Sequence, residues 1–365
     1  MGRSLAILDG NCYIHSGEAN WSRNFNYLGF PTGGIYQLMT KVVRLFTQCI
    51  DFAVVFDSPS FRKSIDADYK SSRKVDPKII AQINALKPCL VRAGVNVLQV
   101  NEFEGDDLIA NIVESNPNRD ITIYTCDYDI AQNVCQNVSI CGCKTGFPSI
   151  TKTNFRATMR MSKAIKKEVP YNLLAMYKVV FGDLSDNYSG VGAEAEKVWQ
   201  VFMKIWERDF DSKDKSLIVT KSFCEKFINA TAKFYTEDTL RALRNNVSLV
   251  FPRMLTEEEI KGNSLSLTSF NNINKSALAD VCHLFGLKKA YYSLQHSEDY
   301  PLTQKEKDWL LDRTRRYKQK VDAINEDVDM HGSATYSGSE VIDSEDEDFN
   351  NDFEEVADGS NVGGF

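Results

Sequence analysis

The sequence predicts an α/β fold, in which a twisted, mainly parallel sheet carries helices on both faces and is followed by a mainly helical region and a disordered acidic tail. Three observations lead to this expectation. Short apolar or β-branched runs alternate with amphipathic stretches in residues 1–160, strand-like runs become rare in residues 161–325, and residues 326–365 contain no lysine or arginine. Strands that alternate with helices favour parallel pairing through crossover connections, which cover both faces of a sheet.

Four runs near the start of the chain have the length and composition of buried strands. They span residues 5–8, 52–56, 95–100 and 121–125. The amphipathic stretches between them predict helices at residues 34–50, 77–93 and 106–114. We therefore assign residues 1–160 to one α/β domain.

Helical patterns dominate the next part of the chain. They predict helices at residues 171–181, 193–208, 222–235 and 275–285. Thr303 and Glu306 have the spacing of a capping box before a further, arginine-rich helix. We expect residues 161–325 to form a mainly helical region. Residues 326–365 are expected to be disordered, because so few aliphatic side chains cannot offset the entropy lost on ordering.

The charge is distributed unevenly along the chain. All 43 lysines and arginines precede residue 321, whereas 13 of the 50 aspartates and glutamates lie in residues 326–365. The formal net charge of −7 is therefore the sum of −13 in the tail and +6 in the rest of the chain. The part of the chain before residue 326 is therefore mildly basic, which is compatible with binding to nucleic acid.

Composition also bears on the cellular compartment. No apolar run approaches the length of about 18 residues that a membrane helix needs. Asp9 comes too early for a signal peptide. Nine cysteines, an odd number without a CxxC pair, fit a reducing compartment better than a disulfide framework. We expect a soluble, cytoplasmic protein that contacts no membrane.

Acidic side chains follow the predicted strands at the point where each strand ends. In chain order they are Asp9, Asp57, Glu104, Asp106, Asp107, Asp127 and Asp129, and Asp183 and Asp186 follow the predicted helix at 171–181. A single acid after a strand is commonly a turn residue or a helix N-cap. Ligands of open parallel sheets bind at the carboxyl ends of the strands, so acids from four strand ends point to one site.

So many carboxylates stay ionised together only around a cation. Oxygen ligands without nearby histidine or cysteine select hard cations, so we expect Mg²⁺, with Mn²⁺ as a substitute. Two such ions suit the hydrolysis of a phosphodiester. The basic segment at residues 58–80 supplies the cations that a doubly charged transition state also needs.

Seven short motifs over about residues 4–200 resemble those of the 5′-nuclease family, which includes phage 5′-exonucleases, the 5′-nuclease domain of DNA polymerase I and flap endonucleases. In family order they are Leu8-Asp9-Gly10-Asn11, Val54-Val55-Phe56-Asp57, Ser60-Phe61-Arg62, Tyr69-Lys70-Ser71-Ser72-Arg73, Phe103-Glu104-Gly105-Asp106-Asp107, Thr125-Cys126-Asp127-Tyr128-Asp129 and Phe181-Gly182-Asp183-Leu184-Ser185-Asp186-Asn187.

This resemblance implies a PIN-like 5′-nuclease fold and a role for each matching residue. Asp9, Asp57, Glu104 and Asp106 would hold the tighter metal ion, and Asp107, Asp127, Asp129, Asp183 and Asp186 would surround the second. Segment 58–80 would belong to a helical arch that admits a 5′ single strand. Lys70 and Arg73 would contact the scissile phosphate and act in catalysis, with Arg62, Tyr69 and Lys74 as further nucleic-acid contacts. For Tyr69, packing against the sheet is an equally good interpretation.

The chain departs from the family in the turn after Asn187. The family pattern Pro-Gly-Val-x-Gly-Ile-Gly-x-Lys grips duplex phosphates in a helix–three-turn–helix region, often with K⁺. Here Gly190 and Lys197 match and Gly192 is a further glycine at a variable position, whereas Ala193 and Ala195 replace glycines. Close backbone approach to phosphate needs glycine, so DNA and K⁺ binding by the region 161–325 is an open question.

The resemblance implies an Mg²⁺-dependent 5′-3′ exonuclease or flap endonuclease that removes primers or flaps in phage or bacterial replication. We expect a monomer that acts on DNA with a 5′ single-stranded end or flap, or on an RNA–DNA primer, in the bacterial host's cytoplasm if a phage encodes it. A non-catalytic DNA-structure-binding factor and a PIN-like ribonuclease are the alternatives. The acidic tail either limits non-specific DNA binding or docks on a replication protein.

A short cysteine motif, Cys141-Gly142-Cys143, has no second cysteine pair to complete a metal site. The four histidines also lack ligand spacing. We assign neither group a function.

Overall fold

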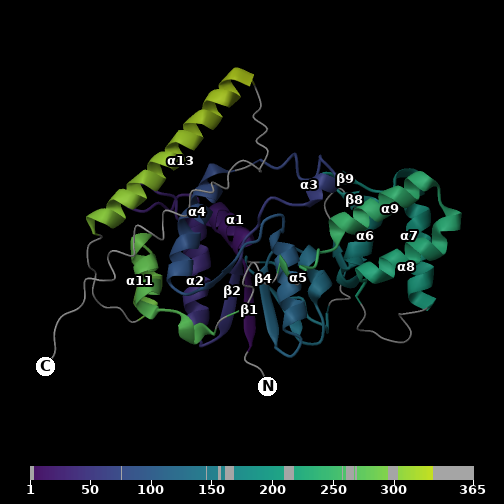
Figure 1. Ribbon diagram of the computed structural model, residues 1–365, viewed down its shortest axis with the longest axis horizontal. Coiled ribbons are helices and arrows are strands. Elements are labelled where there is room, and N and C mark those ends of the chain that lie inside the picture. Colours follow the sequence, from purple (N-terminus) through teal and green to yellow (C-terminus); the bar gives the residue numbers. More distant parts are fainter. Residues whose placement is uncertain are drawn as a thin grey trace.

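The computed structural model describes residues 4–331 except for 75, 145, 155–157, 161–167, 209–217, 257, 260–266, 268 and 295–302 (Figure 1). At its centre is a five-stranded sheet of order β3-β2-β1-β4-β5. The strands are β1 (Leu5–Asp9), β2 (Asp51–Val55), β3 (Asn96–Leu98), β4 (Ile121–Thr125) and β5 (Val138–Gly142). Every pair of neighbours in this sheet is parallel, which confirms the predicted fold class.

Helices cover both faces of the sheet, because alternate residues of each strand point to opposite sides. In β1, Ala6 and Leu8 pack toward α1 (Gly10–Trp21), α2 (Gly33–Thr47) and α4 (Pro77–Arg92). Leu5 and Ile7 pack toward α5 (Gly105–Ser115) on the other side. Figure 1 shows α2 and α4 on one side of the strands and α5 on the other.

One strand of the central sheet and two long helices are not among the elements that the sequence predicts. Strand β5 contains a serine, a cysteine and a glycine within five residues, so its apolar signal is weak. Helix α1 begins directly after Asp9, with no loop to separate it from β1. Helix α9 (Glu237–Val250) has a charged face that lowers its overall hydrophobicity. All three are stabilised by packing, which outweighs a weak local pattern.

The helices α6 (Leu174–Phe181), α7 (Ala195–Trp206), α8 (Lys221–Thr231) and α9 form a second layer of packing with a core of their own. Phe202 is fully buried at its centre, where its ring contacts Trp199 and Trp206 on α7 and Phe227 on α8. These teal and green helices lie beyond α5 in Figure 1.

The last helices return to the α/β core instead of joining that second layer. Leu278 of α11 (Lys275–Leu284), Tyr291 of α12 (Lys288–Ser293) and Leu310 of α13 (Gln304–His331) are buried in the same cluster as α2 and α4. The predicted grouping of residues 161–325 into one helical region thus differs from the packing.

The start of α13 confirms the predicted capping box, because Thr303 and Glu306 bond to each other's side chain and backbone. The helix continues to His331, past the predicted boundary at 325. The remainder of the predicted acidic tail lies outside the described residues. None of the helices in the described ranges is both long and apolar enough to span a membrane.

The remaining elements are short. They are α3 (Arg62–Ile65), the strand pairs β6 (Thr158–Arg160) with β7 (Glu168–Pro170) and β8 (Gly182–Asp183) with β9 (Tyr188–Ser189), and the single turns η1 (Asp129–Asn133), η2 (Tyr171–Leu173), η3 (Gly192–Glu194), η5 (Ala232–Phe234) and η6 (Phe270–Asn272).

Candidate active site

The carboxyl ends of β1 and β4 form the centre of the candidate site. These strands are neighbours in the sheet. Strands β2 and β3 lie on one side of β1, whereas β4 and β5 lie on its other side, so the strand order reverses between β1 and β4. Ligands of open parallel sheets bind in the crevice at such a reversal. A cleft of about 1070 Å³ opens there, lined by the predicted acids Asp9, Asp57, Glu104, Asp106, Asp127, Asp129 and Asp183.

Backbone and hydroxyl donors fix the carboxylates at the end of β1 and β2. The Cys12 N–H and the Thr125 hydroxyl donate to the two oxygens of Asp9, at 2.9 and 2.7 Å. The Gly105 N–H donates to Asp57 at 2.6 Å. A Cβ at position 105 would lie 3.0 Å from the same Asp57 oxygen, so glycine permits this approach. Both carboxylates line the cleft and keep lone pairs for a further ligand.

Two of the crowded carboxylates have raised pKa values. Burial, together with the charge of Asp57, raises the pKa of Asp9 to about 7. Burial and the charge of Asp127 raise the pKa of Asp106 well above its ordinary value. A cation held among these oxygens would offset the repulsion, which adds to the effect of burial in raising both pKa values. The acids offer carboxylate oxygens, which fit a hard divalent ion such as Mg²⁺ or Mn²⁺. Cys12, His15 and Cys126 line the same cleft, so the expectation of a site without nearby histidine or cysteine is wrong.

A second acidic group lies beside the first. The carboxylates of Asp129, Asp183 and Asp186 each offer an oxygen within 4.8 Å of the others. The Lys178 ammonium bonds to Asp129 at 2.6 Å and also to Asp183. Burial acts to raise the pKa of Asp183, but Lys178 outweighs it and holds that pKa below its ordinary value.

Lys178 is a residue that sequence reasoning missed. It lies in α6 among apolar neighbours, and its side chain is largely buried against the two acids. A lone lysine in an apolar helix was the available signal, because a buried ammonium requires a charged partner. In this structure it neutralises part of the second acidic group.

Lys70 and Arg73 line the same cleft. The Lys70 ammonium bonds to Glu104 at 2.8 Å, and Arg73 bonds to Asp186 at 2.5 Å. The Lys70 backbone has φ of 55°, in the left-handed region, and its N–H donates to the Asp186 carbonyl at 2.9 Å. Such strain persists where the surroundings hold it, and here the bond to Asp186 keeps Lys70 facing the acids.

Arg62 and Asp107 require a correction, because the structure pairs them with each other inside the protein. Arg62 is 2% exposed and donates to both oxygens of Asp107, at 2.8 and 2.7 Å, and to Glu104 at 3.1 Å. Asp107 is 0% exposed and also accepts from the Arg253 backbone. Arg62 is therefore too buried to contact nucleic acid, and Asp107 is fully occupied away from the metal-binding edge.

Tyr69 is buried as well, but it packs against Tyr188 and Leu249 and not against the central sheet. Its hydroxyl lies 3.2 Å from both Glu104 and Asp186, and its ring stacks on Tyr188. Lys74 remains exposed on the basic segment. The described residues of 58–80 include α3, turns and the start of α4, and the place of this segment in a helical arch stays a prediction.

The two glycines of the altered turn differ in their surroundings. A Cβ on Gly190 would lie 2.4 Å from the Val180 carbonyl, so Gly190 serves packing within the protein. Gly192 has φ of 69° and open space around it. The Lys197 ammonium bonds to Glu194 at 3.2 Å and to the Phe234 carbonyl at 2.8 Å. DNA binding through this turn stays a prediction.

Comparison with known proteins shows that part of this chain is similar in sequence to 5′-3′ exonucleases. Residues 4–166 match the family model described as the N-terminal resolvase-like domain of 5′-3′ exonuclease. A 5′-3′ exonuclease of Aquifex aeolicus is 29% identical over 196 residues, which cover 52% of this chain and 65% of that protein. One from Mycoplasma pneumoniae is 25% identical over 301 residues, covering 78% of this chain and 97% of that protein.

Among solved structures, that of T5 5′-exonuclease with bound zinc has a TM-score of 0.46 and 15% identity, and the match covers 79% of this chain and 100% of that one. The chain spans just under two thirds of the Aquifex relative's length. Residues 4–166 are thus similar to the N-terminal resolvase-like domain of 5′-3′ exonucleases.

Proposed function

We propose that this protein is an Mg²⁺-dependent 5′-3′ exonuclease or flap endonuclease that hydrolyses phosphodiester bonds of DNA or of RNA–DNA primers. The observation that carries the proposal is the gathering of acids from four strand ends around one cleft, with Lys70 and Arg73 at its rim. Two relatives that match this region are named 5′-3′ exonucleases. The setting that fits best is removal of primers or flaps during phage or bacterial replication.

The residues of the cleft divide into two groups that fit a pair of divalent ions. Asp9, Asp57, Glu104 and Asp106 would hold the first ion, and Asp127, Asp129, Asp183 and Asp186 would surround the second. Such ions supply an attacking hydroxide and neutralise charge on the phosphate when bound.

The basic residues have a separate task in this proposal. Burial acts to lower the pKa of Lys70, but Glu104 and Asp186 outweigh it and raise that pKa, so the ammonium stays charged. Arg73 is about half exposed and is planar and bidentate, which suits a phosphate at the mouth of the cleft. Both cations would exchange a carboxylate partner for the scissile phosphate and stabilise its developing charge.

A direct test uses three 5′-labelled substrates: a flap, a nicked duplex and an RNA-primed duplex, each incubated with Mg²⁺ or with EDTA. We expect short labelled products in Mg²⁺ and intact substrate in EDTA, and the product lengths distinguish stepwise removal from flap cleavage. Binding without cleavage of any substrate in Mg²⁺ would instead favour a non-catalytic DNA-binding factor. Preferential cutting of single-stranded RNA, added as a fourth substrate, would favour a PIN-like ribonuclease.

A further inference from the structure

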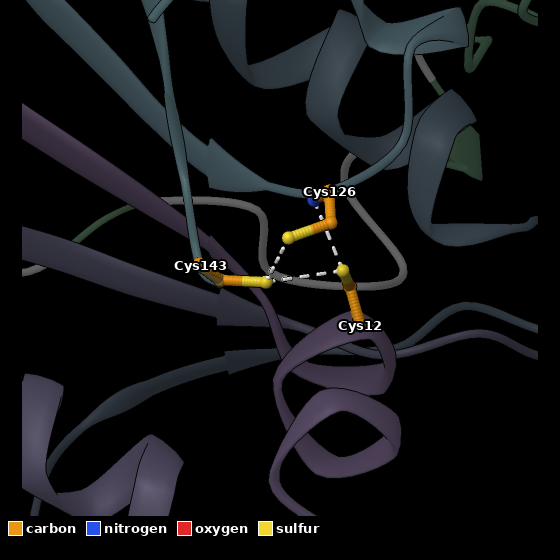
Figure 2. Close-up of side chains that lie close together, drawn as sticks. All are labelled: Cys12, Cys126 and Cys143. Atoms are coloured by element: carbon orange, nitrogen blue, oxygen red, sulfur yellow. Dashed lines mark hydrogen bonds between the residues drawn. The ribbon is translucent and has the colours of Figure 1, made fainter. Parts of the chain in front are cut away.

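Three cysteines that are far apart in the sequence meet at the edge of the cleft. Cys12 lies in the first turn of α1, Cys126 directly follows β4, and Cys143 directly follows β5. Figure 2 shows their side chains pointing toward one another. The sulfur of Cys143 lies 2.8 Å from that of Cys126 and 3.2 Å from that of Cys12, and all three sulfurs lie within 4.8 Å of one another.

The sheet register explains why these thiols converge. Thr125 pairs with Gly142 across β4 and β5, so the next residues, Cys126 and Cys143, are adjacent. The Cys143 N–H donates to the Thr125 carbonyl at 3.2 Å, and the Gln37 side chain donates to the Cys143 carbonyl at 2.7 Å. Cys12 is placed by the start of α1 after β1, and its sulfur accepts from the Cys126 N–H at 3.0 Å. Rigid elements thus hold all three side chains.

The cluster is open to ions that enter the cleft. Each of the three cysteines is partly exposed and free of a disulfide, and Cys12 and Cys126 line the cleft. Cysteine sulfur is a soft ligand that selects Zn²⁺ or Cu⁺ over Mg²⁺. A metal–sulfur distance of about 2.3 Å implies sulfur separations near 3.8 Å, so the side chains need to spread by about an ångström.

We propose that Cys12, Cys126 and Cys143 form a binding site for one soft, thiophilic metal ion, distinct from the carboxylate site that faces the same cleft. Three sulfur ligands leave a fourth position of a tetrahedral ion such as Zn²⁺ to water. The thiol site touches the acids through the backbone, because the Cys12 N–H bonds to Asp9 and Cys126 immediately precedes Asp127. A bound soft ion is therefore coupled to the position of both acids.

Cadmium is a suitable probe, because its bonds to thiolates give an ultraviolet charge-transfer band that carboxylate ligands do not produce. The experiment titrates the full-length, reduced protein with Cd²⁺ in excess Mg²⁺, which occupies oxygen sites. We expect the band to saturate at one equivalent, and Zn²⁺ or Cu⁺ to compete it away. The readout is absorbance, so it stands or fails independently of nuclease activity.

Single substitutions identify the ligands. Cys12→Ser, Cys126→Ser and Cys143→Ser should each weaken Cd²⁺ binding at least about tenfold, because a metal site loses much of its affinity with one ligand. Cys141→Ser is the matched control: it lies two residues before Cys143 on β5 and outside the cluster, and it should leave the titration unchanged.

Three results would overturn the proposal. One is the absence of a charge-transfer band when the unmodified protein is titrated, a result that does not depend on the folding of any variant. Another is equal loss of the band in Cys141→Ser, which would place the thiolates elsewhere. The third is a Cys126–Cys143 disulfide in the isolated protein, mapped by mass spectrometry, together with no Cd²⁺ uptake after reduction.

Discussion

Replacement of Asp127 by asparagine should lower the rate of cleavage in Mg²⁺ by about a hundredfold to a thousandfold, because the change removes a negative charge that the metal site and transition state require. The substitution is mild for the fold. Asp127 is exposed to the cleft, and the oxygen that accepts from the Asp129 N–H at 2.8 Å is retained in the amide. The measurement is the initial rate on the 5′-labelled flap substrate at saturating Mg²⁺.

Asp120→Asn provides the matched control for this experiment. Asp120 is exposed and directly precedes β4, at the opposite end of the strand from Asp127. The same loss of one charge there should leave the rate within about twofold of the unmodified protein, because exposed charges far from a site are screened. An Asp127→Asn protein that cleaves at the normal rate would contradict the assignment of this acid to the metal site.

Replacement of Arg62 by methionine should lower the free energy of unfolding by about 3–5 kcal/mol. The change leaves the carboxylate of Asp107 buried without its cation, at a position with 0% exposure. It also removes the bond from the Arg62 guanidinium to the Leu249 carbonyl at 2.8 Å, which joins α3 to α9. Urea unfolding followed by far-ultraviolet circular dichroism measures the loss.

A surface ion pair supplies the comparison for Arg62. Arg241 bonds to Asp238 at 2.6 Å, but their side chains are 70% and 85% exposed. Arg241→Met should change the free energy of unfolding by no more than about 1 kcal/mol, because exposed pairs contribute little. If the two variants lost equal stability, the buried pair of Arg62 and Asp107 would not have the structural role assigned to it here.

The strand-end acids could be predicted from sequence because their positions depend on local order alone. Asp9, Asp57 and Asp127 each follow a strand that the apolar pattern identifies, and parallel pairing then places them at one edge. No partner has to be known for this step. Lys70 and Arg73 differ from these acids, because their expected place rests on the resemblance of a five-residue motif to the 5′-nuclease family.

Residues whose role depends on a distant partner could not be predicted in this way. Arg62 looks like a surface cation until the fold brings Asp107 and Leu249 to it. The role of Lys178 also could not be predicted, because its acidic partners, Asp129 and Asp183, lie on other elements. The thiol cluster depends on the register of β4 with β5, and β5 itself has too weak a pattern to be predicted.

The most direct test of the metal site is a crystal of the protein soaked in Mn²⁺, with anomalous scattering used to locate the ions. Manganese prefers oxygen ligands, as magnesium does, and its anomalous signal identifies it without reference to activity. The account predicts two anomalous peaks in the cleft, one among Asp9, Glu104 and Asp106 and the other beside Asp129 and Asp183. Peaks confined to surfaces outside the cleft, or a cleft without any peak at saturating Mn²⁺, would contradict it.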